Sequence, residues 1–185
     1  MFIQTETTPN PATLKFLPGR PVLPGDTLEM RSDTDAEVSP LAQALFAVDG
    51  VTGVFYGSDF IAVTKGDVDW QHIKPAVLGV IMEHFMSGVP LIVGDQPEMA
   101  ADEEFFDAAD AGTVETIKEL LETRVRPAVA HDGGDITFRG FRDGVVYLHM
   151  RGACAGCPSS TATLKNGIQN LLRHFLPDVQ EVRPV

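Results

Sequence analysis

Residues 135–160, DITFRGFRDGVVYLHMRGACAGCPSS, contain the pattern that decides the fold of the second half of the chain. Apolar and polar residues alternate on both sides of Arg142-Asp143-Gly144, which is typical of two antiparallel strands joined by a tight turn. The loop with Cys154 and Cys157 follows directly. Pro158 then suits the first position of a helix, because proline has no N–H to leave unpaired there. The stretch predicts a hairpin, a cysteine loop and a helix, and the core-facing side chains of the hairpin are Ile136, Phe138, Val146, Leu148 and Met150.

The neighbouring segments complete a small α+β domain over residues 112–185. Helical spacing of apolar residues predicts helices over residues 113–126 and 158–175. The turn HDGG, residues 131–134, is predicted to end the first helix, with both glycines at positive φ. VQEVRPV, residues 179–185, is predicted to be a last short strand. The apolar face of the second helix is predicted to consist of Leu164, Ile168, Leu171, Leu172 and Phe175.

Residues 1–93 predict a second small α+β domain. Short strands are expected within residues 9–19 and 26–30, where Pro and Gly interrupt the apolar runs. Residues 51–66 are expected to form a hairpin that turns at Gly57-Ser58. The fold class is therefore α+β, with two small domains.

Two helices are predicted in this first domain. One covers residues 39–48, with Ser39 as the capping residue and Pro40 in the first turn. Asp69 is expected to open a longer helix with apolar residues at helical spacing. Pro75 must lie in an early turn of that helix or produce a kink.

Charge is distributed unevenly along the chain. Residues 1–93 carry 5 basic and 11 acidic side chains, residues 94–111 carry 7 acidic and no basic ones, and residues 112–185 carry 9 basic and 8 acidic ones. Like charges repel and extend a segment, so residues 94–111 are predicted to be an acidic linker. Phe105 and Phe106 interrupt its polar composition, and a loosely tethered short helix is the expected structure around them.

The bulk properties of the chain limit its location and partners. A net charge of −12 argues against a nucleic-acid partner, because sequence-independent binding of phosphates needs a basic face. No apolar run approaches the roughly 20 residues that span a bilayer, so no membrane partner is expected. The start, MFIQTETTPNPATLKF, lacks a basic region followed by an apolar one, and the predicted location is the cytoplasm. In a reducing compartment, closely spaced cysteines are more often metal ligands or catalytic groups than structural disulfides.

Cys154 and Cys157 are the only cysteines of the chain, and their spacing fits three kinds of site. Backbone amides of the small residues around them and the start of the following helix are expected to stabilise thiolates. A dithiol oxidoreductase also uses the C-x-x-C spacing, although its motif normally begins the helix with the first cysteine. A zinc site would need two more ligands, such as His131 and His149. Hydroxyl residues after the loop can add hydrogen bonds to it, although their plainer role is to cap the helix: Ser159, Ser160, Thr161 and Thr163.

An iron–sulfur cluster is the third kind of site. Such clusters are commonly held by four thiolates, whereas one chain supplies two. Two chains related by a two-fold axis would supply four, which makes the cluster depend on a contact between subunits. A cluster in that position is suited to being passed on.

The residues of the second domain resemble a known family. VRPAVAHDGGDITFRGFRDGVVYLHMRGACAGCPSSTATLKNGIQNLL is similar to the NifU C-terminal domain of the Nfu iron–sulfur scaffold and carrier proteins. The marks are the R-P-x-V-x-x-D-G-G-D-I stretch and G-A-C-x-G-C-P-S-S ahead of a T-L-K-x-G-I-x-x-L helix. MFIQTETTPNPATLKFLPG and LFAVDGVTGVFYGSDFIAVTK resemble the N-terminal domain of the same family.

The resemblance implies a carrier rather than an enzyme. It implies that Cys154 and Cys157 are the ligands of a [4Fe–4S] cluster bridging two chains, with [2Fe–2S] also possible, and that the homodimer delivers the cluster to apo iron–sulfur proteins. Asp132 and Asp135 fit the turn of the family and are not expected to be ligands. The domain over residues 1–93 has no cysteine, and its implied role is partner docking or modulation.

The family also bears on supply and location. This sequence has no cysteine desulfurase signature, so iron and sulfur are expected from an upstream assembly machinery. Mitochondrial members carry a targeting segment, so the mitochondrial matrix is the alternative location if the chain is a trimmed mature form.

Overall fold

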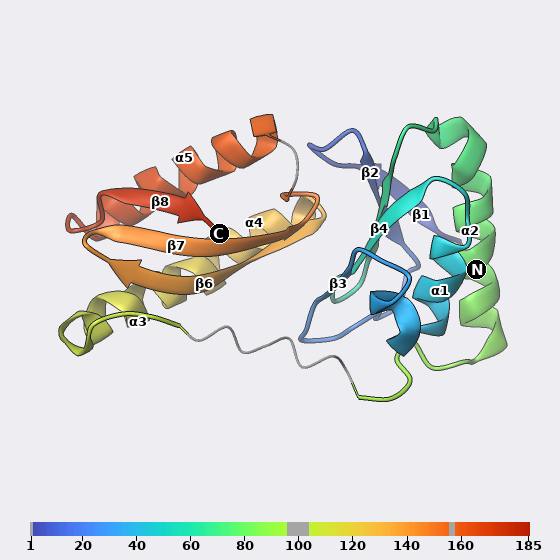
Figure 1. Cartoon of the computed structure of the whole chain (residues 1–185), viewed down its shortest axis with the longest axis horizontal. Helices are drawn as coiled ribbons and strands as arrows, with labels where there is room; N and C mark the ends of the chain where they lie inside the picture. The colour runs from blue at the N-terminus through green and yellow to red at the C-terminus, as the bar shows by residue number, and fades with distance from the viewer. Residues whose placement is uncertain (1, 96–103, 156–157) are drawn as a thin grey trace. The chain divides into compact units, whose positions relative to one another are not determined.

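The computed structural model describes residues 2–95, 104–155 and 158–185, with the side chains of residues 158–160 left aside. The chain divides into two compact units, residues 1–99 and residues 100–185 (Figure 1). Both combine helices with a sheet, which confirms the α+β class. Of the predicted linker, residues 96–103 lie outside the described residues and residues 104–111 belong to the second unit.

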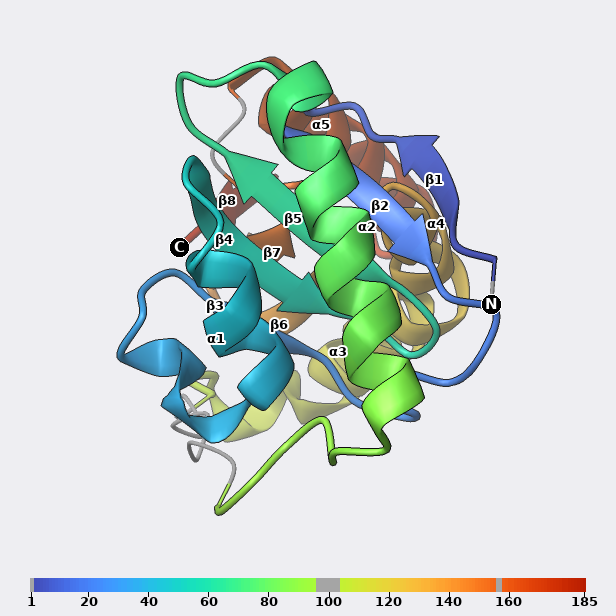
Figure 2. The same cartoon turned by 90° about the vertical axis from the view of Figure 1, so that its right-hand side faces the viewer.

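The first unit has an antiparallel five-stranded sheet in the order β1-β2-β5-β4-β3. Its strands are β1 (Gln4–Thr7), β2 (Thr13–Leu17), β3 (Leu28–Met30), β4 (Val51–Tyr56) and β5 (Ile61–Lys65). The predicted hairpin is β4–β5, in which Val54 pairs with Val63. Helices α1 (Pro40–Phe46) and α2 (Trp70–Ser87) lie on one face of the sheet (Figure 2), next to a 3-10 turn at Asp35–Val38.

The helices of the first unit start where predicted, and the Ser39 side chain caps its helix, whereas the Asp69 side chain makes no cap hydrogen bond. The Ser39 hydroxyl accepts a hydrogen bond from the backbone N–H of Ala42 at 3.3 Å, and it also lies 2.7 Å from the buried Tyr56 hydroxyl. Asp69 precedes α2, and Pro75 lies within the first two turns of this helix. Ser39 therefore both caps α1 and ties it to the sheet.

The second unit begins with a 3-10 turn at Ala108–Asp110 and a helical run made of α3 (Ala111–Leu120), a π-turn at Leu121–Val125 and α4 (Arg126–His131). The run is five residues longer than predicted at its C-terminal end. Pro127 lacks an N–H for the carbonyl one turn earlier, and a widened turn just before it accommodates the loss.

The sheet of this unit has the order β6-β7-β8, with β6 (Gly134–Arg142) antiparallel to β7 (Val145–Gly152) and β8 (Glu181–Pro184) parallel to β7. Asp143 and Gly144 have φ of 52° and 75°, as a tight hairpin turn requires. Helix α5 (Pro158–Phe175) joins β7 to β8. All five predicted hairpin side chains are in the buried core.

Two side chains of the second unit lie where the sequence did not place them. Phe175 was expected on the apolar face of α5 but is 45% exposed, because it is the last residue of the helix. The Arg124 guanidinium lies 5.2 Å from the centre of the Phe175 ring. Phe105 was expected in a loose helix, and it instead forms a β-bridge with Gly140.

In the part of the chain that the structure describes, no helix is both long and apolar enough to cross a membrane.

Candidate functional site

The cysteine loop begins where β7 ends. Gly152 is the last residue of this strand and has φ of 67°, which turns the chain back over the start of β6. Cys154 follows two residues later and is buried at 6% exposure within the core of the second unit. Cys157 lies outside the described residues. The structure therefore places one of the two predicted ligands.

The seat of Cys154 is made by the second glycine of the DGGD turn. A Cβ on Gly134 would lie 2.8 Å from the Cys154 sulfur and 2.6 Å from the carbonyl oxygen of Arg151, closer than real Cβ contacts. Gly133 has φ of 82° and fits the predicted role at the helix end, whereas Gly134 is in β6 and does not have positive φ. For Gly134 the helix-end prediction is wrong, and the physical requirement is space for the loop.

Hydrogen bonds of the described residues fasten the loop to its surroundings. The N–H of Ala153 donates to the carbonyl of Gly133 at 3.1 Å. The Thr161 hydroxyl donates to the carbonyl of Cys154 at 2.9 Å, which joins the first turns of α5 to the loop. Thr161 thus makes one of the hydrogen bonds that the sequence allowed for its hydroxyl residues beside their capping role.

The environment of the Cys154 sulfur favours the thiol. Burial, together with the smaller effect of the negative charges of Asp132 and Asp135, raises the pKa of Cys154 to about 12. The expectation that the loop stabilises a thiolate is wrong for Cys154, because burial removes the solvent that would stabilise the charged form. A metal ion binding this sulfur must displace a proton.

Asp135 has a structural role that the sequence did not reveal. Its two carboxylate oxygens accept hydrogen bonds from Nε and Nη2 of Arg126 at 2.9 and 3.0 Å, and its Oδ1 also accepts from the N–H of Ile136 at 2.8 Å. Arg126 also pairs with Glu122 at 2.7 Å. These carboxylates raise the pKa of Arg126, with the hydrogen bond to Asp135 as the largest cause.

This bidentate ion pair fixes the start of β6 to the start of α4 and so holds Gly134 in place beneath the loop. The sequence pattern that could have indicated this ion pair is the R-P-x-V-x-x-D-G-G-D-I stretch, because it contains both Arg126 and Asp135.

The two histidines considered for a zinc site are not gathered with Cys154. His131 ends α4 and is exposed. His149 pairs with Thr137 and alternates with the core residues Leu148 and Met150, so its side chain leaves the opposite face of the sheet. Across residues 2–95, 104–155 and 158–185, no group of three or more His, Cys, Asp or Glu side chains is arranged to hold a metal ion.

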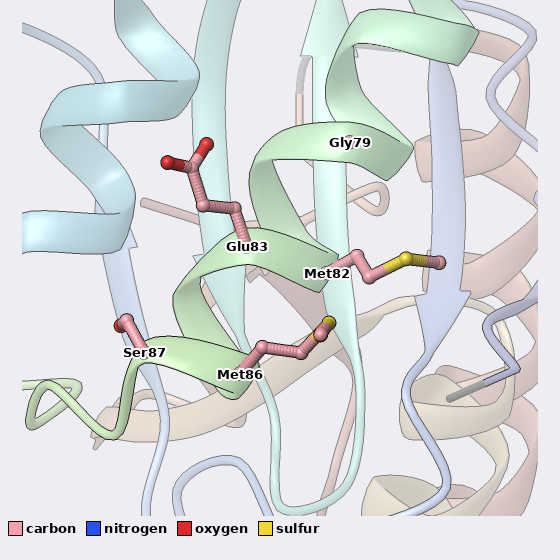
Figure 3. A pocket seen from close by; sticks show the side chains of 5 residues that line it. All are labelled: Gly79, Met82, Glu83, Met86 and Ser87. Carbon is pink, nitrogen blue, oxygen red and sulfur yellow. The ribbon is translucent and has the colours of Figure 1, made fainter.

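The first unit has a separate surface feature on α2. Gly79, Met82, Glu83, Met86 and Ser87 line a shallow groove of about 440 Å³ on the exposed side of this helix (Figure 3). Met82 is 37% and Met86 73% exposed, whereas Ile73, Val77 and Ile81 of the same helix are buried. The residues that line the groove include neither cysteine nor histidine.

Fold and site together define a class of protein: two small α+β units, the second carrying a C-x-x-C loop between a hairpin and a helix. Residues 3–88 match the family model "Scaffold protein Nfu/NifU N terminal", and residues 117–183 match "NifU-like domain". The chain belongs to the Nfu family of scaffold proteins.

Three relatives show how far the similarity extends. "NFU1 iron-sulfur cluster scaffold homolog, mitochondrial" of Drosophila sechellia is 52% identical over 100% of this chain and 65% of its own length. The human protein of the same description is 49% identical over 100% of this chain and 72% of its own length. "NifU-like protein 5, mitochondrial" of Arabidopsis thaliana is 50% identical over 98% of this chain and 67% of its own length. The chain thus spans about two thirds of the length of these relatives.

Proposed function

We propose that this protein is an iron–sulfur cluster scaffold and carrier. Two chains hold one [4Fe–4S] cluster through Cys154 and Cys157 of each, and the homodimer transfers it to apo iron–sulfur proteins. The observation that carries the proposal is a NifU-like domain with only two cysteines, which is half of the usual ligand set. Relatives at about 50% identity, described as iron–sulfur cluster scaffolds, support the same function.

The buried seat of Cys154 suits the release step. As a recipient thiol loses its proton and bonds to iron, the Cys154 sulfur leaves the iron and takes up a proton. A pKa of about 12 strongly favours that protonated product at neutral pH.

The remaining parts of the proposal concern partners and location. The second unit receives clusters from an upstream assembly machinery, and the first unit docks or modulates partners through a surface with 11 acidic and 5 basic side chains over residues 1–93. The role is that of a carrier and not of an enzyme. The relatives are described as mitochondrial, which supports the matrix alternative over the predicted cytoplasm.

Anaerobic reconstitution with iron and sulfide tests the function. We expect a brown dimer with one [4Fe–4S] cluster per two chains, measured by metal analysis, Mössbauer spectroscopy and sizing. Cys154→Ala and Cys157→Ala should each leave the chain colourless. A conserved-volume control, Cys154→Ser, should keep the fold by circular dichroism and still fail to hold a stable cluster.

Two results would replace the proposal with the alternatives. A colourless monomer that retains one zinc ion would favour a zinc-binding interaction module. Efficient turnover of disulfide substrates without iron would favour a thiol-disulfide oxidoreductase.

A further inference from the structure

A short segment of the chain occupies the free edge of β6. We call Glu104, Phe105 and Phe106 the strap. The N–H of Phe105 donates to the carbonyl of Arg139 at 3.1 Å, and its carbonyl accepts from the N–H of Phe141 at 2.9 Å. Phe105 therefore pairs with Gly140 as an added strand would, at the irregularity where the β6–β7 register shifts.

The ring of Phe105 has a seat that only glycine permits. A Cβ on Gly140 would lie 2.4 Å from this ring, so the ring rests directly on the glycine backbone. The Tyr147 ring lies 5.1 Å away at 56°, and the Arg142 guanidinium lies 5.4 Å from the ring centre. The Phe105 ring thus contacts the bare backbone of Gly140 and lies next to the Tyr147 ring and the Arg142 cation.

A basic side chain recognises the residue before the phenylalanine. The Lys118 ammonium forms an ion pair with the Glu104 carboxylate, and it also lies 5.6 Å from the Phe138 ring. Lys118 beside the carboxylate and Arg142 beside the ring thus place positive charge at the seat. The seat is therefore complementary to an extended segment in which a carboxylate directly precedes an aromatic residue.

We propose that this seat is a peptide-docking site for acidic–aromatic segments of a partner protein, and that the strap occupies it in competition with the partner. The partner segment would add to the edge of β6, place its aromatic ring on Gly140 and pair its carboxylate with Lys118. This is strand addition, in which backbone hydrogen bonds give affinity and side-chain seats give specificity.

The strap is held weakly enough to be exchanged. It makes one bridge of two backbone hydrogen bonds, and its ion pair is open to solvent, with side-chain exposures of 44% for Lys118 and 38% for Glu104. Exposed ion pairs of this kind and single backbone hydrogen bonds each contribute little net stability. Phe106, the next residue of the strap, is 39% exposed.

The site is placed so that a docked partner leaves the cysteine loop open. In the β6–β7 ladder, Gly134 pairs with Gly152 beside the loop, whereas Arg142 pairs with Val145 at the hairpin turn. Gly140 is six residues from Gly134 along the same strand, or about 20 Å at 3.3 Å per residue. The strap and the cysteine loop thus lie at opposite ends of the hairpin (Figure 1).

The test uses the full chain and a fluorescein-labelled peptide of residues 102–108, DEEFFDA. Phe105→Ala removes the competing ring, so this variant should bind the peptide at least tenfold more tightly than the unchanged protein by fluorescence anisotropy. Phe106→Ala is the matched control and should bind like the unchanged protein. The same peptide with alanine in place of its first phenylalanine should not bind.

Further variants keep the proposal open to refutation. Gly140→Ala added to Phe105→Ala fills the seat and should abolish peptide binding. If Phe105→Ala does not fold, Glu104→Ala should give a smaller gain in the same direction. A folded Phe105→Ala protein that does not bind the peptide, or that binds it no better than the Phe106→Ala control, overturns the proposal. Cys154→Ala should not alter peptide binding, which separates this result from cluster binding.

Discussion

At Gly134 the β6 backbone runs so close to the cysteine loop that no side chain fits between them. The neighbours of the missing Cβ include the backbone oxygen of Arg151 and the buried sulfur of Cys154, and a backbone atom cannot move aside cheaply. The geometry of the candidate ligand therefore depends on a residue with no functional group of its own.

Gly134→Ala is expected to destabilise the second unit by about 1–3 kcal/mol, the usual range for overpacking, and to weaken cluster retention. Gly167→Ala is the matched control: nothing lies within 4 Å of its added Cβ, and it is exposed within α5. That change should stabilise the helix by roughly 0.5–1 kcal/mol. Chemical denaturation measures both. Equal effects of the two substitutions would contradict the packing argument.

The raised pKa of Cys154 gives a reactivity prediction. In a Cys157→Ala protein, the alkylation rate of Cys154 should rise about tenfold per pH unit from pH 7 to pH 10 without a plateau, because the thiolate fraction keeps increasing below a pKa of about 12. Iodoacetamide labelling followed by mass spectrometry gives the rate. The same protein in denaturant should level off near the ordinary thiol pKa, about 8.5. A native plateau near pH 8 would mean that the thiol is not buried in solution.

Between elements, the ion pair of Arg126 and Asp135 joins the helical run to the first strand of the hairpin. The Asp135 side chain is 5% exposed, so removal of the arginine leaves a carboxylate that is buried without its counter-charge. The Arg126 side chain is 35% exposed, and solvent reduces the effect. The pair is thus a fastening between elements more than a large source of net stability.

Arg126→Ala is expected to lower the free energy of unfolding of the second unit by on the order of 2 kcal/mol. Arg126→Ala combined with Asp135→Asn should recover part of the loss, because the second change removes the unpaired charge. Arg183→Ala, which breaks an exposed pair with Glu181, serves as the arginine control and should change stability little. A double-mutant cycle by urea denaturation measures the coupling, and additive losses would show that the pair is not coupled.

On the scale of the whole molecule, each unit has its own core and the two cores share no residue. The first core is built around Phe16, Met30 and Tyr56, and the second around Ile117, Ile136 and Leu148. The chain is therefore expected to unfold in two separable steps.

His84 belongs to the first unit. Burial lowers the pKa of its side chain, so the folded unit favours the neutral imidazole. Its contribution to stability is complete above the unfolded histidine pKa of about 6.5 and is lost as the pH falls towards the lowered folded value. The first-unit transition of a His84→Gln protein should thus depend less on pH between 7.5 and 5.5 than that of the unchanged protein. Calorimetry measures this. His72→Gln, at an exposed position, is the control, and an equal flattening by both changes would contradict the assignment.

A fragment prediction follows from the division into units. Residues 100–185 alone should bind a cluster after reconstitution, and residues 1–99 should bind none, because both cysteines are in the second unit. Iron and sulfide analysis of the two fragments measures this. Cluster retention by residues 1–99 would contradict the proposed ligands.

The sequence by itself determined the features that are periodic or local. Alternation gave the β6–β7 hairpin, the Asp143-Gly144 turn gave its end, and Ser39 with Pro40 marked the start of α1. It also determined the proposed chemistry, because two cysteines at C-x-x-C spacing are half of a four-thiolate site.

Only the tertiary structure decided what distant residues do to one another. It gave Gly134 the role of making room for a sulfur, paired Arg126 with Asp135, and seated Phe105 on Gly140. It also made Cys154 a buried thiol where the local pattern indicated a thiolate. The physical reason is that periodicity along the chain records which face of an element is buried. Close approach and desolvation depend on elements that meet only when the chain folds.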